Sequence, residues 1–254
     1  MKGVILAGGG GTRLWPLTKV INKHLLPVGP YPMIYYPLGT LVEAGIEDII
    51  IVTGGNNAGM FLELLGNGRD FGLRHLNYTH QDRAGGIAHA LRLTEDFVDG
   101  ERCVVMLGDN ILGGSIKRHV EAFAQQDKGA KILLTEVATP ESYGVAEVDD
   151  EGRVKQIVEK PQEFISNYAV IGVYMYDEQV WEIIPTLTAS ARGELEITDV
   201  NNAYLERGLL TADVIECEWG DGGESFESYH EATHVAERNQ PLAGFEALGE
   251  LKES

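Results

Sequence analysis

The stretch GVILAGGGGTRLWP, residues 3–16, indicates how the first half of this chain folds. It begins with the apolar and small residues that are typical of a buried strand. It continues with Gly8, Gly9, Gly10 and Gly11, and then with Thr12 and Arg13. Residues without a Cβ let backbone N–H groups approach an anion closely. We therefore expect a phosphate-binding turn with a cation beside it, and the alternative is a glycine-rich turn that carries a surface arginine.

Two familiar phosphate-binding motifs are excluded by the same residues. The dinucleotide pattern GxGxxG, started at Gly8, would need a glycine at position 13, which is Arg13. No GK[ST] sequence follows the glycines, so the turn is not a Walker A loop either. The missing GxGxxG disfavours a dehydrogenase.

The segments around this turn alternate between strand-like and helix-like patterns. Short apolar or β-branched runs predict strands at 2–7, 48–53, 73–79 and 102–107. The intervening segments 32–45, 57–66 and 85–97 have helix-like spacing of apolar residues. This order predicts a parallel sheet covered on both faces, with ligands at the carboxyl ends of its strands.

After about residue 130 the strand-like runs follow one another more closely. They occupy 130–137, 143–149, 153–160, 168–176 and 209–218. We expect mixed or antiparallel strands there, without an internal repeat or a linker. The predicted fold class is α/β, with a Rossmann-like, mostly parallel central sheet flanked by helices and added mixed or antiparallel strands.

Composition restricts the possible partners. The formal net charge of −19 argues against nucleic acid, because such binding depends on Lys and Arg that neutralise phosphates. An anionic small substrate would need a locally basic or metal-assisted site. The chain starts directly with a strand pattern and has no apolar run of about 20 residues, so we expect no membrane association and a cytoplasmic location. Cys103 and Cys217 form no metal-binding pattern and are expected to be reduced.

Several further motifs carry a resemblance to a known family. Besides LAGGGGTRLWPLT and NKHLLPV, these are PMIYYPL (32–38), LGDNI (107–111), YGVAE (143–147), VEKP (158–161), SNYAVIGVY (166–174) and ARGELEITDVNNAYLE (191–206). Their order and spacing resemble the sugar-1-phosphate nucleotidyltransferases, and among these most of all the short glucose-1-phosphate thymidylyltransferases. The resemblance extends from residue 3 to about 230.

The resemblance implies a fold of the nucleotide-diphospho-sugar transferase type. It implies a single domain, 1–254, with a nucleotide-binding half (about 1–112), a sugar-phosphate-binding half (about 113–240) and a short C-terminal segment. The expected substrates are a nucleoside triphosphate, dTTP or UTP, and a sugar 1-phosphate, with glucose 1-phosphate the first choice. The sugar-phosphate oxygen would attack the α-phosphorus in line and release pyrophosphate, with Mg²⁺ as the cofactor.

The resemblance also implies roles for individual residues. The catalytic set is Arg13, Lys23, Asp109 and Lys160, and the metal ligands are Asp109 and Asp221. Each lysine taken alone could be a surface residue, and Asp109 could simply end a strand. The loop at Asp221 departs from the usual W-x-D-T-G-T pattern, because Gly222, Gly223 and Glu224 follow the aspartate here.

Binding residues follow from the same comparison. The nucleotide-binding residues implied are Gly8, Gly9, Gly10, Gly11, Thr12, Arg13, Gln81 and Gly86. The sugar-phosphate-binding residues implied are Tyr143, Gly144, Glu159, Lys160, Val170, Tyr174 and Arg192. Neighbouring residues on a regular strand point to opposite faces, so Glu159 and Lys160 could instead be a surface pair. The ELEITDV segment, 194–200, is equally well explained as scaffold.

Two histidines depart from the thymidylyltransferase pattern. His24 stands where glutamine is usual after the lysine, and His89 replaces glutamine in GIAHA. The base preference therefore stays open, as do a uridylyl- or other nucleotidyltransferase acting on a different hexose 1-phosphate and a non-catalytic nucleotide-sugar sensor. The aromatic residues of 31–38 are either core or the contact surface of a homo-oligomer.

Overall fold

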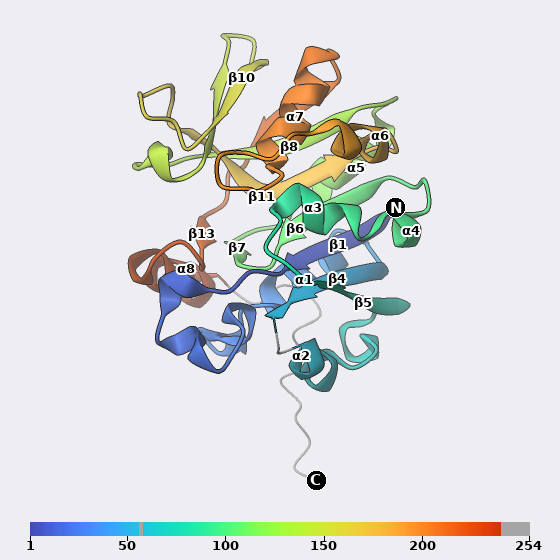
Figure 1. The fold of residues 1–254 in the computed structure, drawn as a ribbon, viewed down its shortest axis with the longest axis vertical. Helices are drawn as coiled ribbons and strands as arrows, with labels where there is room; N and C mark the ends of the chain where they lie inside the picture. Colours follow the sequence, from blue (N-terminus) through green and yellow to red (C-terminus); the bar gives the residue numbers. More distant parts are fainter. Residues whose placement is uncertain (56–57, 240–254) are drawn as a thin grey trace. The chain divides into compact units, whose positions relative to one another are not determined.

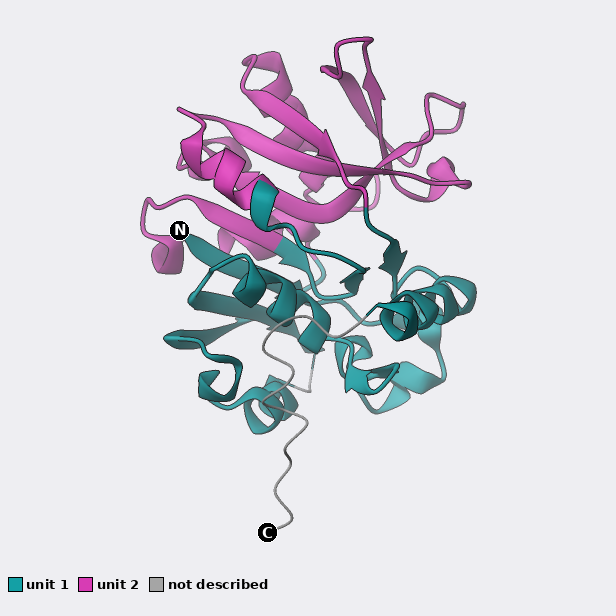
Figure 2. Ribbon diagram, turned by 180° about the vertical axis from the view of Figure 1, so that it is seen from behind, with its two compact units in different colours: residues 1–84, 106–118, 217–254 teal, residues 85–105, 119–216 magenta. Residues whose placement is uncertain are grey.

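The computed structural model describes residues 1–55 and 58–239, which divide into two compact units. The first unit contains the described residues of 1–84, 106–118 and 217–239, and the second contains 85–105 and 119–216 (Figure 2). The two functional halves expected from the sequence, 1–112 and 113–240, stay predictions, as does the single domain 1–254. The expected short C-terminal segment after residue 239 lies outside the described residues.

Three parallel strands form the sheet of the first unit (Figure 1). The central strand β4 (Asp48–Gly54) lies between β1 (Lys2–Ala7) and β5 (His75–Gln81). All seven residues of β4 are buried, as expected for a strand covered on both faces. In the observed register Ala7 pairs with Thr53, and Gly54 pairs with Gln81. The three strands therefore end at one edge, where the glycine turn begins.

Six further elements of the first unit build a second core beside this sheet. They are β2 (Pro27–Val28), β3 (Tyr31–Pro32), α1 (Tyr35–Glu43), β7 (Asn110–Leu112), β13 (Trp219–Asp221) and α8 (Phe226–Arg238). The unit also contains helix α2 (Ala58–Leu65). The short strands pair antiparallel, β2 with β3 and β7 with β13. The buried residues of this core are Val28, Met33, Tyr36, Ile111, Ala232 and Val235. Helix α8 is thus fixed against β7 and β13 by apolar burial.

The aromatic stretch 31–38 belongs largely to this core. Met33, Ile34 and Leu38 are fully buried, and Tyr36 is buried with its hydroxyl donating to Val28 O at 2.5 Å. The core interpretation therefore holds for Tyr36, whereas Tyr31 and Tyr35 are only half-buried. A homo-oligomer stays a prediction.

The second unit has a mixed sheet of five strands. They are β8 (Ala130–Glu136), β9 (Gly144–Val148), β10 (Val154–Glu159), β11 (Tyr168–Tyr176) and β12 (Leu210–Val214). Strand β11 pairs antiparallel with β8 and β9, and β9 pairs antiparallel with β10. Only β12 is parallel to its neighbour, β8. The expected α/β class, with parallel strands first and mixed strands after residue 130, is confirmed.

The helices of the second unit include α3 (Ile87–Arg92), α4 (Glu95–Val98), α6 (Val180–Ile183) and α7 (Ile197–Glu206). Strand β6 (Cys103–Leu107) and helix α5 (Lys117–Gln125) each span a boundary between the units along the chain. Within the described residues no helix combines the length and the apolar character that a membrane crossing requires.

The continuous helix-like pattern expected over 85–97 is wrong in detail. Gly86 has φ +94°, so the helix begins only at Ile87. After Arg92 the buried Thr94 donates its hydroxyl to Leu91 O at 2.7 Å, which gives that carbonyl a side-chain partner where the helical pattern ends. Two short helices, α3 and α4, result.

Candidate active site

The glycine turn leaves β1 exactly where the sequence pattern places it. Gly9 and Gly11 have φ values of +92° and +59°, a region that residues with a Cβ rarely adopt. Thr18 donates its hydroxyl to Gly11 O at 2.7 Å, and the fully buried Leu14 anchors the short 3₁₀ turn Thr12–Leu14 that follows. The turn is therefore held in shape by its own neighbours.

Gln81 lies against this turn at the end of β5. A Cβ placed on Gly8 would lie 2.7 Å from Gln81 Oε1, and one on Gly54 would lie 3.1 Å from Gly8 Cα. A side chain at Gly8 would displace the Gln81 amide, and one at Gly54 would crowd the backbone of the turn. The structure thus brings together Gly8 and Gln81, two of the expected nucleotide-binding residues.

Gly86, another expected nucleotide-binding residue, belongs to the second unit. Its positive φ and its closeness to Leu195, whose carbonyl oxygen would lie 2.4 Å from an added Cβ, leave room for glycine alone. The neighbouring Gly85 O accepts from Leu195 N at 2.8 Å. Gly86 therefore packs on the segment that leads into α7.

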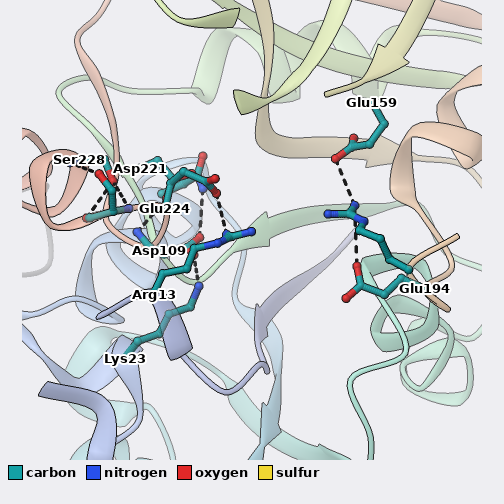
Figure 3. A network of polar contacts seen from close by, with 12 residues as sticks. Arg13, Lys23, Asp109, Glu159, Glu194, Asp221, Glu224 and Ser228 are labelled. Carbon is teal, nitrogen blue, oxygen red and sulfur yellow. Dashed lines mark hydrogen bonds and ion pairs between the residues drawn. The ribbon is translucent and has the colours of Figure 1, made fainter. Parts of the chain in front are cut away.

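A lysine and two aspartates form a partly buried charged cluster in the first unit. Lys23 makes an ion pair with Asp109 Oδ2, and Asp221 lies close enough to both to affect their ionisation (Figure 3). Burial opposes ionisation of Asp109, but Lys23 outweighs it and the pKa of Asp109 is lowered to about 2. Burial and the neighbouring Asp109 carboxylate raise the pKa of Asp221 to about 7. The site thus holds more negative charge than its lysine neutralises.

The two aspartates are brought together by pairing between strands from distant parts of the sequence. Asp221 faces Asn110 in the β7–β13 register, and Gly222 N donates to Asp109 O at 2.8 Å. Trp219 Nε1 of β13 donates to Asn110 Oδ1 of β7 at 2.7 Å and gives the two strands a further bond. The sequence predicted both aspartates, and the structure places them in one site.

The donor set of this cluster fits Mg²⁺. Two carboxylates lie side by side, and among the residues described there is no cluster of three or more His, Cys, Asp or Glu side chains that could enclose a metal ion. Mg²⁺ is commonly bound by one or two carboxylates, with substrate phosphates and water as the remaining ligands. A two-carboxylate site beside the glycine turn suits that mode.

Arg13 makes an ion pair that the sequence analysis did not predict. Its Nη1 donates to Glu224 Oε2 at 2.6 Å, with the two side chains 52% and 25% exposed (Figure 3). Glu224 follows the glycines after Asp221, in the loop that departs from the family pattern. That departure was the only sequence signal for this contact.

His24 is buried and neutral in this arrangement. Burial, together with the neighbouring Lys23, lowers the pKa of His24 to about 3. Its Nδ1 lies 2.7 Å from Asn22 Oδ1, which also accepts from His24 N at 2.9 Å. A Cβ on Gly108 would lie 2.7 Å from the ring. His24 therefore holds the turn that presents Lys23.

In the second unit, Glu159 and Arg192 gather with two residues that the sequence analysis did not assign. Glu159 accepts from Thr198 Oγ1 at 2.7 Å and from Arg192 Nη2 at 3.4 Å. Figure 3 marks the second of these bonds with a dashed line at the labelled Glu159. Arg192 is also held by Glu196, with Nη2 to Oε2 at 2.9 Å. Thr198 and Glu196 belong to the ELEITDV segment, which is both scaffold for α7 and part of this cluster.

Gly144 opens the space in front of Glu159. An added Cβ there would lie 3.3 Å from Glu159 Oε2, 3.2 Å from Thr198 Oγ1 and 4.0 Å from Val170 Cβ. Gly144, Glu159, Arg192 and Val170 of the expected sugar-phosphate residues therefore lie together. Tyr174 is buried and stacks on Tyr176 with ring centroids 6.2 Å apart, so its ring belongs to the core of the unit.

Lys160 has an uncommon backbone conformation for a residue with a side chain. Its φ is +44°, and its N–H donates to Tyr143 O at 2.9 Å. Strand β10 ends at Glu159, so the alternation of a regular strand no longer forces Glu159 and Lys160 onto opposite faces. The backbone geometry therefore allows Glu159 and Lys160 to serve one site.

Comparisons with known proteins agree on one family. The model of the family described as "Nucleotidyl transferase" matches residues 2–239. The glucose-1-phosphate thymidylyltransferase of Actinoplanes sp. is 47% identical over 215 residues, which are 85% of this chain and 71% of that protein. The enzyme of the same name from Neisseria meningitidis is 43% identical over 245 residues, 95% of this chain and 84% of its own.

Solved structures similar to this chain carry names of the same kind of enzyme. A protein from Bacillus anthracis, described as a candidate glucose-1-phosphate thymidylyltransferase and solved in complex with a sucrose, is 49% identical with a TM-score of 0.91. The alignment covers 97% of this chain and 99% of that one. A UDP-glucose pyrophosphorylase complexed with UDP-glucose is 28% identical with a TM-score of 0.82, over 93% and 98% of the two chains.

Proposed function

The chain belongs to the nucleotidyl transferase family, and we propose that it acts as a glucose-1-phosphate thymidylyltransferase. The reaction joins the thymidylyl group of dTTP to glucose 1-phosphate and releases pyrophosphate. Several relatives 42–47% identical carry this name, whereas the UDP-glucose pyrophosphorylase is 28% identical, which favours dTTP over UTP.

The observation that carries the proposal is the partly buried cluster of Lys23, Asp109 and Asp221 beside the glycine turn. Both substrates are polyanions, so the site must neutralise charge that develops on phosphate oxygens. The attacking sugar phosphate is already ionised, and a base that removes a proton is unnecessary. Positive charge and in-line placement are what the reaction needs.

We propose the following division of work in the first unit. The N–H groups of the glycine turn bind the triphosphate, Lys23 lies beside the α-phosphate, and Arg13 stabilises charge on the α-phosphorus and on the departing pyrophosphate. Asp109 and Asp221 would hold Mg²⁺, which when bound supplies Lewis-acid stabilisation of the phosphate oxygens. Gln81 reads the base through its amide.

In the second unit, Glu159 accepts hydrogen bonds from sugar hydroxyls, and Thr198 keeps its carboxylate oriented through the 2.7 Å bond. Lys160 binds the phosphate of the sugar, and Arg192 assists at the same phosphate. The hydrogen bond to Glu196 holds the Arg192 guanidinium in place. Gly144 leaves room for the sugar ring in front of Glu159. Tyr143 supplies the backbone carbonyl that fixes Lys160.

A pyrophosphate-release screen tests the proposal. It combines dTTP, UTP, ATP, CTP and GTP with the 1-phosphates of glucose, galactose, mannose and N-acetylglucosamine in the presence of Mg²⁺. We expect dTTP with glucose 1-phosphate to give the highest kcat/KM. A higher value for UTP would favour the uridylyltransferase alternative, and no turnover with any pair would favour the nucleotide-sugar sensor.

The variant Asp109→Asn provides the internal control for that screen. It keeps the shape of the side chain but removes the charge that pairs with Lys23 and would bind the metal, so kcat should fall about a hundredfold. Its circular dichroism should match that of the wild type. Mg²⁺-dependent turnover at the wild-type rate in this variant would refute the ligand assignment.

A further inference from the structure

We propose that Glu224 is a positioning residue that orients the Arg13 guanidinium toward the bound triphosphate. The inference rests on the proposed function, because it assigns a role to Arg13 in that reaction. Of the described residues, Glu224 is the only one that forms a hydrogen bond with the Arg13 side chain. The contact uses Nη1 and leaves Nη2 and Nε for phosphate oxygens.

Arg13 needs such an anchor because little else restrains it. Its side chain is about half exposed and leaves a three-residue turn that follows two glycines of positive φ. A long arginine side chain loses much rotamer entropy when it is fixed. A carboxylate that fixes it before the substrate arrives removes part of that cost from the binding and chemical steps.

Glu224 itself stands on a rigid segment. On one side of it, Gly222 N donates to Asp109 O at 2.8 Å and Gly223 N donates to Asp221 Oδ1 at 2.8 Å. On the other side, Ser225 and Ser228 form the reciprocal capping box that starts α8, with N–H to hydroxyl distances of 2.9 and 3.1 Å. The anchor is therefore tied both to the two aspartates and to a helix start.

Because Glu224 is negatively charged, the direction in which its removal changes polyanion binding tests the proposal. Among the described residues of this site, the carboxylates of Asp109, Asp221 and Glu224 face two cations, Lys23 and Arg13. Removing a carboxylate should by itself therefore strengthen the binding of a polyanion. A positioning role predicts the opposite, because Arg13 loses its orientation. The two explanations therefore differ in the direction of the effect.

Two variants separate orientation from charge. Glu224→Gln keeps a side-chain oxygen that can accept from Arg13, and Glu224→Ala removes it. We expect Glu224→Ala to lower kcat about tenfold and to raise KM for the nucleotide no more than about threefold. Glu224→Gln should stay within about threefold of the wild-type kcat. KM for the sugar phosphate should be unchanged in both variants.

A double-mutant cycle shows whether Glu224 acts through Arg13. Glu224→Ala should lower kcat in the wild-type background but not in an Arg13→Ala background. Glu218→Ala serves as the matched control, because Glu218 forms an exposed ion pair with Arg238 at 2.8 Å in the same unit, and its kinetics should equal the wild type. Additive losses in the double variant would overturn the proposal.

Binding of inorganic tripolyphosphate with Mg²⁺, measured by calorimetry, gives a readout that does not depend on which nucleotide is the substrate. Glu224→Ala should weaken this binding about threefold, and Glu224→Gln should not weaken it. Equal or tighter binding by Glu224→Ala would make Glu224 a competing anion and reject the positioning role. If the wild type turned over no pair in the substrate screen, the proposed function would be rejected. The tripolyphosphate binding of the wild type and the two Glu224 variants would still decide the role of Glu224.

Discussion

At the scale of single residues, the charged cluster depends on a glycine that carries no charge. Gly223 lies so close to the Lys23–Asp109 ion pair that an added Cβ would be 2.3 Å from Asp109 Oδ2 and 2.6 Å from Lys23 Nζ. Real Cβ atoms do not approach other atoms this closely. The absence of a side chain at position 223 is therefore part of the site.

We predict that Gly223→Ala separates Lys23 from Asp109 and lowers kcat about tenfold or more, since small misplacements of catalytic groups are costly. The matched control is Gly59→Ala in α2 of the same unit, because a Cβ added to Gly59 would meet no heavy atom within 4 Å. Steady-state kinetics on both variants check the prediction. Equal activity of the two variants would contradict the special role of position 223.

At the scale of elements, one carboxylate joins the starts of the three parallel strands. Asp48, the first residue of β4, accepts from Arg74 Nε at 3.0 Å, lies 2.8 Å from His75 Nδ1 on β5, and lies 3.4 Å from Lys2 Nζ on β1. Its side chain is only 6% exposed. These partners, the Arg74 hydrogen bond first, outweigh burial and hold the pKa of Asp48 well below its usual range.

We predict that Asp48→Asn lowers the free energy of unfolding by about 1–3 kcal/mol at neutral pH. Because the pKa of Asp48 is depressed in the folded state, its contribution is complete above the unfolded pKa of about 3.9 and is lost as the pH falls through the folded value. Urea unfolding between pH 8 and pH 3 measures the difference between wild type and variant. It should stay constant down to about pH 5 and shrink below about pH 4.

The exposed pair of Glu151 and Arg153, at 2.8 Å, gives the control for that experiment. Glu151→Gln should change the stability much less, because exposed ion pairs contribute little. An Asp48→Asn variant that is as stable as Glu151→Gln would show that the Asp48 contacts do not stabilise the strand starts.

At the scale of the whole molecule, the large negative net charge dominates the electrostatics. The chain has 39 acidic and 20 basic residues, which give the formal charge of −19. Such an excess repels itself in the compact state, and salt screens it over a Debye length of about 10 Å at 0.1 M. The proposed phosphate site is no exception, because the carboxylates of Asp109, Asp221 and Glu224 outnumber the two cations beside the glycine turn.

We predict that raising NaCl from about 0.02 to 0.5 M increases Tm by roughly 2–4 °C, the shift that about 1 kcal/mol produces in a chain of this size. Differential scanning calorimetry checks this, with choline chloride as a control for specific cation binding. A Tm that falls with both salts would show that attractive ion pairs outweigh the net repulsion.

The sequence by itself determined the elements whose signals are local. The apolar runs predicted β1 and β11 at their observed bounds, and the glycine run predicted the turn after β1. The motifs identified the family and named Lys23, Asp109 and Asp221 before their geometry was known. Periodicity, turn residues and motifs are read within a short window, and these features need nothing more.

Only the tertiary structure decided the contacts between residues far apart in the sequence. The short strands β7 and β13 have too few residues to show a pattern, yet their register joins Asp221 to Asp109. The ion pair of Arg13 with Glu224 spans 211 positions, and the bond from Thr198 to Glu159 spans 39. Such contacts depend on strand register and on packing of whole elements, and no local stretch of residues encodes those.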